Sequence, residues 1–204
     1  ELLICDKISL MNLKSTLITI GGIVATFIFL FFVYKLTNAP VATEFPEINI
    51  IKTQDHVKWN VKSKNILVEY SDYECPACHN LHTFLDQFEK PATPDAQLVF
   101  RHFPLYQIHP ASFNAAYAAE AASIQGKFWE MTGLLFDTQN QWGKLTQPES
   151  YFADLAKKLK LDVNKFKIDL ASQTVKDRVQ SDLSEGEKIG INSTPSLFLN
   201  GKKV

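Results

Sequence analysis

The sequence predicts an α/β domain that carries a helical insertion and follows a membrane-spanning segment. Three short runs rich in strand-forming residues predict buried strands at Ile66–Tyr70, Leu98–His102 and Ser196–Asn200. A helical pattern separates the first two runs, and a long all-helical stretch, about 106–190, separates the second from the third. A strand–helix–strand unit with a late hairpin is typical of an α/β domain. The membrane segment is predicted by the uncharged apolar block Ser15–Tyr34.

The block Ser15–Tyr34 has the length of a bilayer-spanning helix, because about 20 apolar residues cross the hydrocarbon core. A cleavable signal peptide is the alternative, but its apolar region usually runs only about 7–15 residues. Lysines before the block and glutamates after it favour an N-terminus on the cytoplasmic side. We therefore expect a cytoplasmic segment at 1–14, an uncleaved anchor at 15–36 and a linker at 37–56.

Composition and charge exclude some classes of protein. The chain has 46% hydrophobic and 21% charged residues, which is ordinary for a globular protein. Its formal net charge of −1 gives no basis for phosphate neutralisation, so we expect no nucleic-acid partner. Three cysteines are too few for a disulfide framework. Cys5 stands alone, whereas the spacing of Cys75 and Cys78 is typical of redox or metal chemistry.

The soluble part, predicted over 57–204, is mostly helical between its strands. The predicted helices are Cys75–Lys90, Ala111–Ile124, Lys127–Phe136, about 146–161, a short one capped by Asp162, and Thr174–Ile189. Thr146 and Glu149 form a capping-box pattern, and Gly190 is placed to end the last helix. The pair Asn200–Gly201 predicts a tight hairpin after the third strand.

The run Cys75-Pro76-Ala77-Cys78 carries the chemistry that the sequence indicates. It follows the first strand after a four-residue connection, which places Cys75 at a helix N-terminus. Unpaired N–H groups there favour the thiolate, which is the reactive species in disulfide exchange. Pro76 suits the first helical position, since its missing N–H would be unpaired anyway. We expect Cys75 to be exposed and nucleophilic, and Cys78 to be more buried and to resolve the mixed disulfide.

A zinc site is the alternative interpretation of these cysteines. Cys75, Cys78 and His82 fall on one helical face, and His79 is adjacent. A structural zinc site usually needs four ligands, often from a second pair, and the sequence contains no second CxxC and no HxxxH. We therefore favour a redox pair and predict no metal, with His79 and His82 as ordinary helix-face residues.

The segment Val68–Cys78 (VEYSDYECPAC) resembles the active-site segment of bacterial DsbA-type thiol–disulfide oxidoreductases. The resemblance continues over most of the domain, through Phe100–Leu105, His109, Asn114–Ala116, Gly126–Trp129 and Gly190–Ser196. It implies a thioredoxin fold with an inserted helical subdomain. The sheet of that fold needs a returning strand and a closing helix. Only three residues follow Gly201, so we expect both to be missing from this chain.

The resemblance also implies supporting residues around the cysteines. Thr194 and Pro195 occupy the place of a cis-proline loop that faces the cysteine pair and binds extended peptide. Glu69 matches a buried acid behind the pair, where it would accept a proton or tune the pKa of Cys78. The alternation along its strand is not clean, so a solvent-facing Glu69 stays open.

The activity implied is the oxidation of dithiols in unfolded or reduced secreted proteins, with the Cys75–Cys78 disulfide as the redox group and no other cofactor. The Pro76-Ala77 dipeptide lacks the histidine of strongly oxidising members, so extreme oxidising power is not implied. Disulfide isomerase or reductase activity is the alternative within the class. A zinc module and a tethered binding domain are alternatives outside it. We expect a single-pass protein of the cell membrane, with an extracytoplasmic domain and a quinone-linked membrane partner.

Some polar and aromatic residues have simpler interpretations. Glu120 lies in an alanine-rich helix and is expected on a solvated face. His109 is expected to pack in the core or the subdomain, as are Trp129, Trp142 and Phe136. Arg101 and His102 end a strand, where they would most often simply cap it; pairing with Glu69 or lining the substrate groove are the alternatives.

Overall fold

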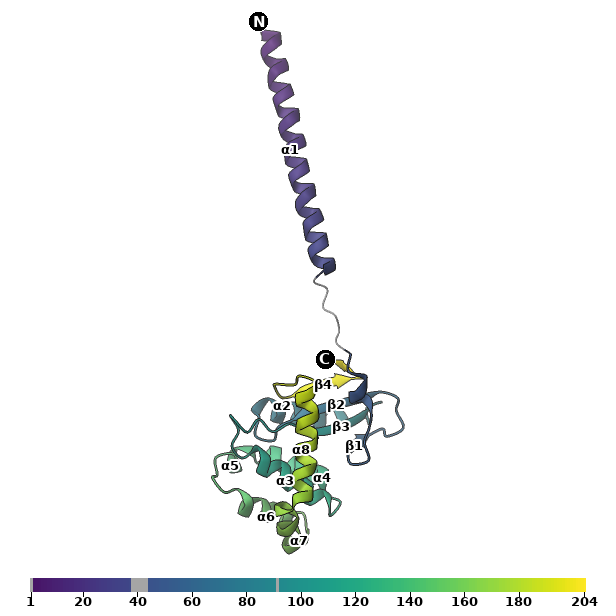
Figure 1. Cartoon of the computed structure of the whole chain (residues 1–204), viewed down its shortest axis with the longest axis vertical. Coiled ribbons are helices and arrows are strands. Elements are labelled where there is room, and N and C mark those ends of the chain that lie inside the picture. Colours follow the sequence, from purple (N-terminus) through teal and green to yellow (C-terminus); the bar gives the residue numbers. More distant parts are fainter. Residues whose placement is uncertain (1, 38–43, 91) are drawn as a thin grey trace. The chain divides into compact units, whose positions relative to one another are not determined.

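The computed structural model of the chain describes residues 2–37, 44–90 and 92–204 (Figure 1). Side chains are described for 17–35 and for the residues from 44 on, apart from 91. The chain divides into two units, Glu1–Ala42 and Thr43–Val204. The side chain of Cys5 and residues 38–43 of the expected linker lie outside what the structure describes.

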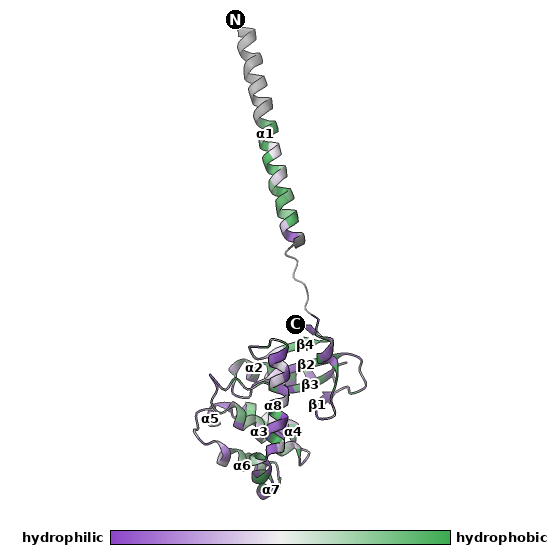
Figure 2. Ribbon diagram, in the orientation of Figure 1, coloured by the Kyte–Doolittle hydropathy of each residue, from purple (hydrophilic) through white to green (hydrophobic). Residues whose placement is uncertain are grey.

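The N-terminal unit contains the helix α1 (Leu2–Thr37). Within it, Leu17–Lys35 forms a 19-residue segment of mean hydropathy 2.4, and none of that segment is buried (Figure 2). Length and composition suit a membrane span, and a signal sequence near an N-terminus has the same properties. The predicted apolar helix is therefore present. It begins at Leu2, which is earlier than the expected start of the anchor at residue 15.

The second unit is built on a five-stranded sheet with the order β1-β3-β2-β4-β5. The strands are β1 (His56–Trp59), β2 (Ile66–Ser71), β3 (Gln97–His102), β4 (Ser196–Leu199) and β5 (Lys202–Lys203). Strands β2 and β3 are parallel, whereas the other neighbours are antiparallel. The three predicted strands are confirmed. The expectation that the returning strand is missing is wrong, because the two-residue strand β5 pairs with β4. Asn200 and Gly201 both have positive φ, 52° and 79°, as the predicted hairpin turn requires.

The segment expected to be a linker packs on this domain from Glu44 onward. It forms the 3-10 helix η1 (Pro46–Asn49) and the edge strand β1. Ile48 is fully buried, and the N–H of Phe45 donates to the carbonyl of Gly201 at 2.8 Å. The expected boundary at 57 therefore differs from the structure, because burial of these apolar side chains ties 44–56 to the sheet.

Seven helices occur within the described part of this unit; six follow the predicted order, and the short helix α5 was not predicted. They are α2 (Pro76–Glu89), α3 (Ser112–Ser123), α4 (Phe128–Asp137), α5 (Gln139–Trp142), α6 (Glu149–Lys158), α7 (Val163–Ala171) and α8 (Gln173–Lys188). Asp162 caps α7 as predicted, by accepting from the N–H of Lys165. The predicted capping box is wrong. Pro148 is the N-cap residue of α6 and makes no side-chain cap, so Glu149 is the first helical residue.

The two faces of the sheet bury different residues. Phe100 packs with Cys78 and the helices of the insertion. Val68, Tyr70 and Phe198 pack on the other face with Leu183 of α8. Helix α8 runs along both the sheet and the insertion helices, so it joins the two parts of the domain (Figure 1).

Candidate active site at the start of helix α2

The cysteine pair lies where β2 gives way to α2. Cys75 is the N-cap residue of α2, and Pro76 occupies the first turn, as predicted. The N–H of Cys75 donates to the carbonyl of Asp72 at 3.1 Å, and the carbonyl of Cys75 accepts from the N–H of His79 at 3.1 Å. Both cysteines are free thiols in this structure. The geometry therefore directs the open end of a helix toward the sulfur of Cys75.

The two thiols differ in cover and in contacts. Cys78 is fully buried, and its Sγ accepts from the N–H of Asp72 at 3.5 Å. Cys75 is only 7% exposed, so the expectation of an exposed nucleophile is wrong for this state. Thr194 covers it, with its carbonyl 3.4 Å from the Sγ of Cys75. Pro76 and Ala77 are the exposed residues of the active-site turn.

The pKa values of the two thiols move in opposite directions. A hydrogen bond from Cys78 lowers the pKa of Cys75 to about 5, with help from Thr194 and from the N–H groups of Cys78 and Ala77, against the effect of burial. The same hydrogen bond, together with burial, raises the pKa of Cys78 well above its usual range. The pair therefore holds one thiolate, on Cys75, and one thiol, on Cys78.

The resemblance to DsbA-type proteins placed Thr194 and Pro195 opposite the cysteines, and the structure brings them together. The Thr194–Pro195 peptide bond is cis. The hydroxyl of Thr194 is buried and has no hydrogen-bond partner among the described residues. The Thr194 side chain lowers the pKa of Cys75, because its free hydroxyl can donate to the thiolate once Cys75 ionises.

Glu69 is buried behind the pair, which removes the solvent-facing alternative. Its residue is 3% exposed, and burial raises its pKa to about 7, with Ser71 and Lys58 acting in the opposite direction. Glu69 and Ser71 are two positions apart on β2 and therefore share a face of the sheet. The hydroxyl of Ser71 lowers the pKa of both Glu69 and Cys78. Ser71, which the sequence did not single out, thus acts on both of these groups.

Several other residues that hold the active-site loop were missed from sequence. The carboxylate of Asp72 is fully buried and accepts from the N–H of Glu74 at 2.8 Å. It also accepts from Nδ1 of His109 at 2.7 Å. Gln139 of α5 donates to the carbonyls of Tyr73 and Cys75, at 2.8 and 3.0 Å. Residues from the insertion therefore set the backbone around the cysteines.

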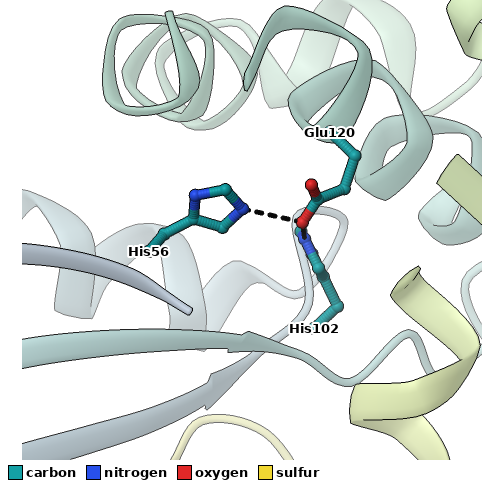
Figure 3. Close-up of side chains that lie close together, drawn as sticks. All are labelled: His56, His102 and Glu120. Atoms are coloured by element: carbon teal, nitrogen blue, oxygen red, sulfur yellow. Dashed lines mark hydrogen bonds and ion pairs between the residues drawn. The ribbon is translucent and has the colours of Figure 1, made fainter. Parts of the chain in front are cut away.

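A second buried cluster lies on the same side of the sheet. Oε1 of Glu120 accepts from Nε2 of His56 and of His102, each at 2.8 Å (Figure 3). Glu120 is 5% exposed, so its expected place on a solvated face is wrong. Its helix α3 contacts α4, α6, α7 and α8, and no residue of α3 is exposed beyond an intermediate degree.

These three side chains could offer ligands to a metal ion. Their donor atoms lie within 4.8 Å of one another, and zinc uses two histidines and a glutamate in some catalytic sites. A guanidinium nitrogen of Arg178, however, already lies 3.8 Å from Oε1 of Glu120. Burial works against ionisation of Glu120, but hydrogen bonds from His102 and His56 outweigh it and hold the pKa well below its usual range. A dication here would face that guanidinium, so we assign the cluster a structural role.

Arg101 belongs to the same charged system and does not reach Glu69. Its side chain is fully buried and pairs with Asp55 at 2.9 Å and with Glu185 of α8 at 3.3 Å. It also donates to the carbonyl of Ile50 at 2.9 Å. Arg101 thus anchors the segment before β1 to the sheet.

Comparisons with known proteins agree with this fold. The family model described as Thioredoxin matches residues 52–204. A thioredoxin-like oxidoreductase from Silicibacter pomeroyi has a TM-score of 0.63 at 24% identity, over 75% of this chain and 84% of that one. BdbD from Bacillus subtilis gives 0.65 at 24% identity, over 74% and 83% of the two chains. Wolbachia pipientis alpha-DsbA1 gives 0.66 at 20% identity, over 76% and 78%.

Curated relatives are longer proteins. The Na(+)/H(+) antiporter NhaA 1 of Mycolicibacterium vanbaalenii is 34% identical over 186 residues, which are 87% of this chain but 29% of that protein. The protein of the same name from Mycolicibacterium gilvum is 37% identical over 154 residues, 74% of this chain and 24% of that protein. The chain thus spans about a quarter to a third of these relatives. By the family match and the shared fold, the chain belongs to the thioredoxin family and has the DsbA-like fold that its sequence predicted.

Proposed function

We propose that this chain is a thiol–disulfide oxidoreductase, and that it works as a dithiol oxidase. The observation that carries the proposal is the asymmetry of the cysteine pair. Cys75 at the helix N-terminus has a pKa lowered to about 5. The hydrogen bond to Cys75, together with burial, raises the pKa of Cys78. A stabilised thiolate favours the reduced pair, and a pair that prefers to be reduced oxidises its substrate.

The catalytic steps follow from the contacts of the two sulfurs. A substrate thiolate attacks Sγ of Cys75, the Cys75–Cys78 bond breaks, and Cys78 leaves with the electron pair and takes up a proton. A second substrate thiolate then attacks the substrate sulfur of the mixed disulfide, and Cys75 leaves as a thiolate. The substrate loses two electrons and two protons, and the cysteine pair gains the two electrons.

Glu69 and Ser71 provide the proton for Cys78. Cys78 is fully buried, so its departing sulfur cannot draw on bulk water directly. Glu69 has a pKa raised to about 7 by burial, and it can therefore hold or release a proton near neutral pH. Ser71 acts on both groups and suits a relay between them.

The proposed setting is the extracytoplasmic side of a membrane. The apolar segment Leu17–Lys35 supports an anchor by length and composition. Disulfides persist in oxidising compartments, so unfolded or reduced secreted proteins are the proposed substrates. The reduced pair would pass its electrons to a quinone-linked membrane partner. No cofactor besides the Cys75–Cys78 disulfide is proposed.

Equilibration of the pair against reduced and oxidised glutathione tests this function. We expect a reversible two-electron transition between about −270 and −120 mV, the range that thioredoxin and DsbA span. A pair that cannot be cycled, or one zinc ion per chain that blocks thiol labelling, would contradict the oxidoreductase and support the zinc alternative. Isomerase activity would show as faster reshuffling of scrambled disulfides than oxidation of reduced substrate.

A further inference from the structure

His109 lies outside the cysteine motif but connects to it through Asp72. Nδ1 of His109 is 2.7 Å from Oδ2 of Asp72, and that same oxygen accepts from the N–H of Leu105 at 2.8 Å. The side chain of His109 is 16% exposed and that of Asp72 is fully buried. The carboxyl group is therefore removed from water, and these protein donors satisfy its oxygen.

Asp72 contacts both cysteines through its backbone. Its N–H donates to Sγ of Cys78 at 3.5 Å, and its carbonyl accepts from the N–H of Cys75 at 3.1 Å. The peptide groups that touch the two cysteines are therefore fixed by the side chain that His109 holds. A shift of Asp72 would move the donor of Cys78 and the N-cap of α2 together.

His109 also compensates negative charge beside the site. Burial raises the pKa of Glu74, the charge of Asp72 adds to the rise, and the N–H of Ala111 and the charge of His109 oppose it. Asp72 and Glu74 are thus two carboxyl groups within three residues of Cys75 in the chain, and the sulfur of Cys75 must ionise. Uncompensated negative charge at such a place disfavours a thiolate.

The position of His109 is held by residues at the start of the helical insertion. Its N–H donates to the carbonyl of Leu105 at 2.9 Å, and its carbonyl accepts from the hydroxyl of Ser112 at 2.7 Å. Glu74 meets the same loop by accepting from the N–H of Ala111 at 2.7 Å. The loop between β3 and α3 therefore presents one imidazole to the cysteine loop.

We propose that His109 is a positioning residue for the cysteine pair: by holding Asp72 and balancing its charge, it favours the Cys75 thiolate and makes the Cys75–Cys78 disulfide more oxidising. This inference rests on the proposed redox function. His109 affects how strongly the disulfide oxidises its substrate, and the two cysteines carry out the exchange.

The test compares His109→Ala, His109→Asn and His56→Ala with the wild type in the glutathione equilibrium. His109→Ala should shift the equilibrium constant toward the protein disulfide by about three- to tenfold, since a hydrogen bond to a charged group is lost. His109→Asn keeps a short N–H donor and should recover most of the shift. His56 is a matched control, because its side chain is also 16% exposed and also bonds a buried carboxylate, but not one in the cysteine loop.

The outcomes separate this inference from the proposed function. A wild type without a reversible transition would overturn the function itself. A reversible wild type whose constant stays within twofold in His109→Ala, or shifts equally in His56→Ala, would overturn the role of His109. If His109→Ala does not fold, the wild type still provides a test, by nitrogen NMR of its imidazoles. Reduction of the pair should change the signals of His109 more than those of His56, and equal changes would contradict the coupling.

Discussion

The cysteine site and the cluster of His56, His102 and Glu120 lie on one face of the sheet, and the two differ in how their charged groups are paired. Register places Ser71 beside His102 on neighbouring strands, so the two clusters adjoin. Around the cysteines, Oε1 of Glu69 and the hydroxyls of Ser71 and Thr194 have no hydrogen-bond partner among the described residues, and no ion pair to Glu69 is found among them. Atoms of the histidine cluster, such as Nδ1 of His102 and the terminal nitrogens of Arg178, also have no hydrogen-bond partner there, so the difference lies in the pairing of charges.

In the histidine cluster the charges face opposite charges. Glu120 accepts from both imidazoles, and Arg178 pairs with Asp182 and faces Glu120. Paired buried charges hold a structure together, whereas unpaired groups with displaced pKa values are found where protons and electrons move. We infer that the cysteine site is arranged for chemistry and the neighbouring cluster for stability.

Loss of a cysteine should have the largest effect on activity. Cys75→Ser is expected to reduce dithiol oxidation to the uncatalysed rate, because no sulfur remains for the substrate to attack. In Cys78→Ser, the Cys75 thiolate should attack a substrate disulfide and release a substrate thiolate, and the mixed disulfide should stay trapped because no resolving thiol remains, which is visible on a non-reducing gel. Turnover by Cys75→Ser, or a Cys78→Ser variant that traps nothing, would contradict the roles assigned to the two sulfurs.

Loss of Glu120 should have the largest effect on stability and little on chemistry. Glu120→Gln is expected to cost about 3–5 kcal/mol in the free energy of unfolding, because buried cationic groups lose their partner. Glu130, whose side chain is 45% exposed and pairs with Lys127, is the control. Glu130→Gln should change stability by less than about 0.5 kcal/mol. Equal effects in denaturant titrations would show that the cluster is not a structural centre.

Glu69→Gln should trade activity for stability. The pKa of Glu69 is raised to about 7 by burial, so ionisation of Glu69 destabilises the folded state as the pH rises through that value. The variant should therefore gain about 1–3 kcal/mol of stability at pH 8 and nothing at pH 4. It should also slow the release of Cys78. A stability gain that is the same at both pH values would argue against a buried, titrating carboxyl.

The smallest effect is expected at Thr194. Thr194→Val removes the hydroxyl that lowers the pKa of Cys75 and leaves in place the larger contribution of Cys78 and the smaller ones of the N–H groups of Cys78 and Ala77. The glutathione equilibrium constant should move by about two- to fivefold toward the disulfide, since one hydrogen bond to a charged group is lost at a partly open site. A larger change than in the His109 variants would reverse the ranking of these two residues.

Local patterns in the sequence predicted much of the fold and the reactive cysteine pair. The strands β2, β3 and β4 are compact apolar runs, and the helix after Cys75 has a clear period. Strand β1 gave no such signal, because its four residues are all half-buried at the edge of the sheet. Its place is fixed by Arg101, which binds the preceding segment from another strand.

The supporting residues depend on contacts that a local pattern does not contain. His109 and Asp72 are 37 positions apart, and nothing in either neighbourhood indicates that they meet. Glu120 was misplaced because an alanine-rich helix has no polar face from which to judge burial. Thr194 and Glu69 were found only through a family resemblance.

The most direct test of the central claim is the thiolate titration of the reduced protein, followed by absorbance at 240 nm and compared with Cys75→Ser. The low pKa of Cys75 should give one thiolate with a midpoint near pH 5. The stability of the reduced form relative to the disulfide form should then be lost as the pH falls through that midpoint. A midpoint of about 8.5, the value of an ordinary cysteine, would contradict the account of an activated Cys75.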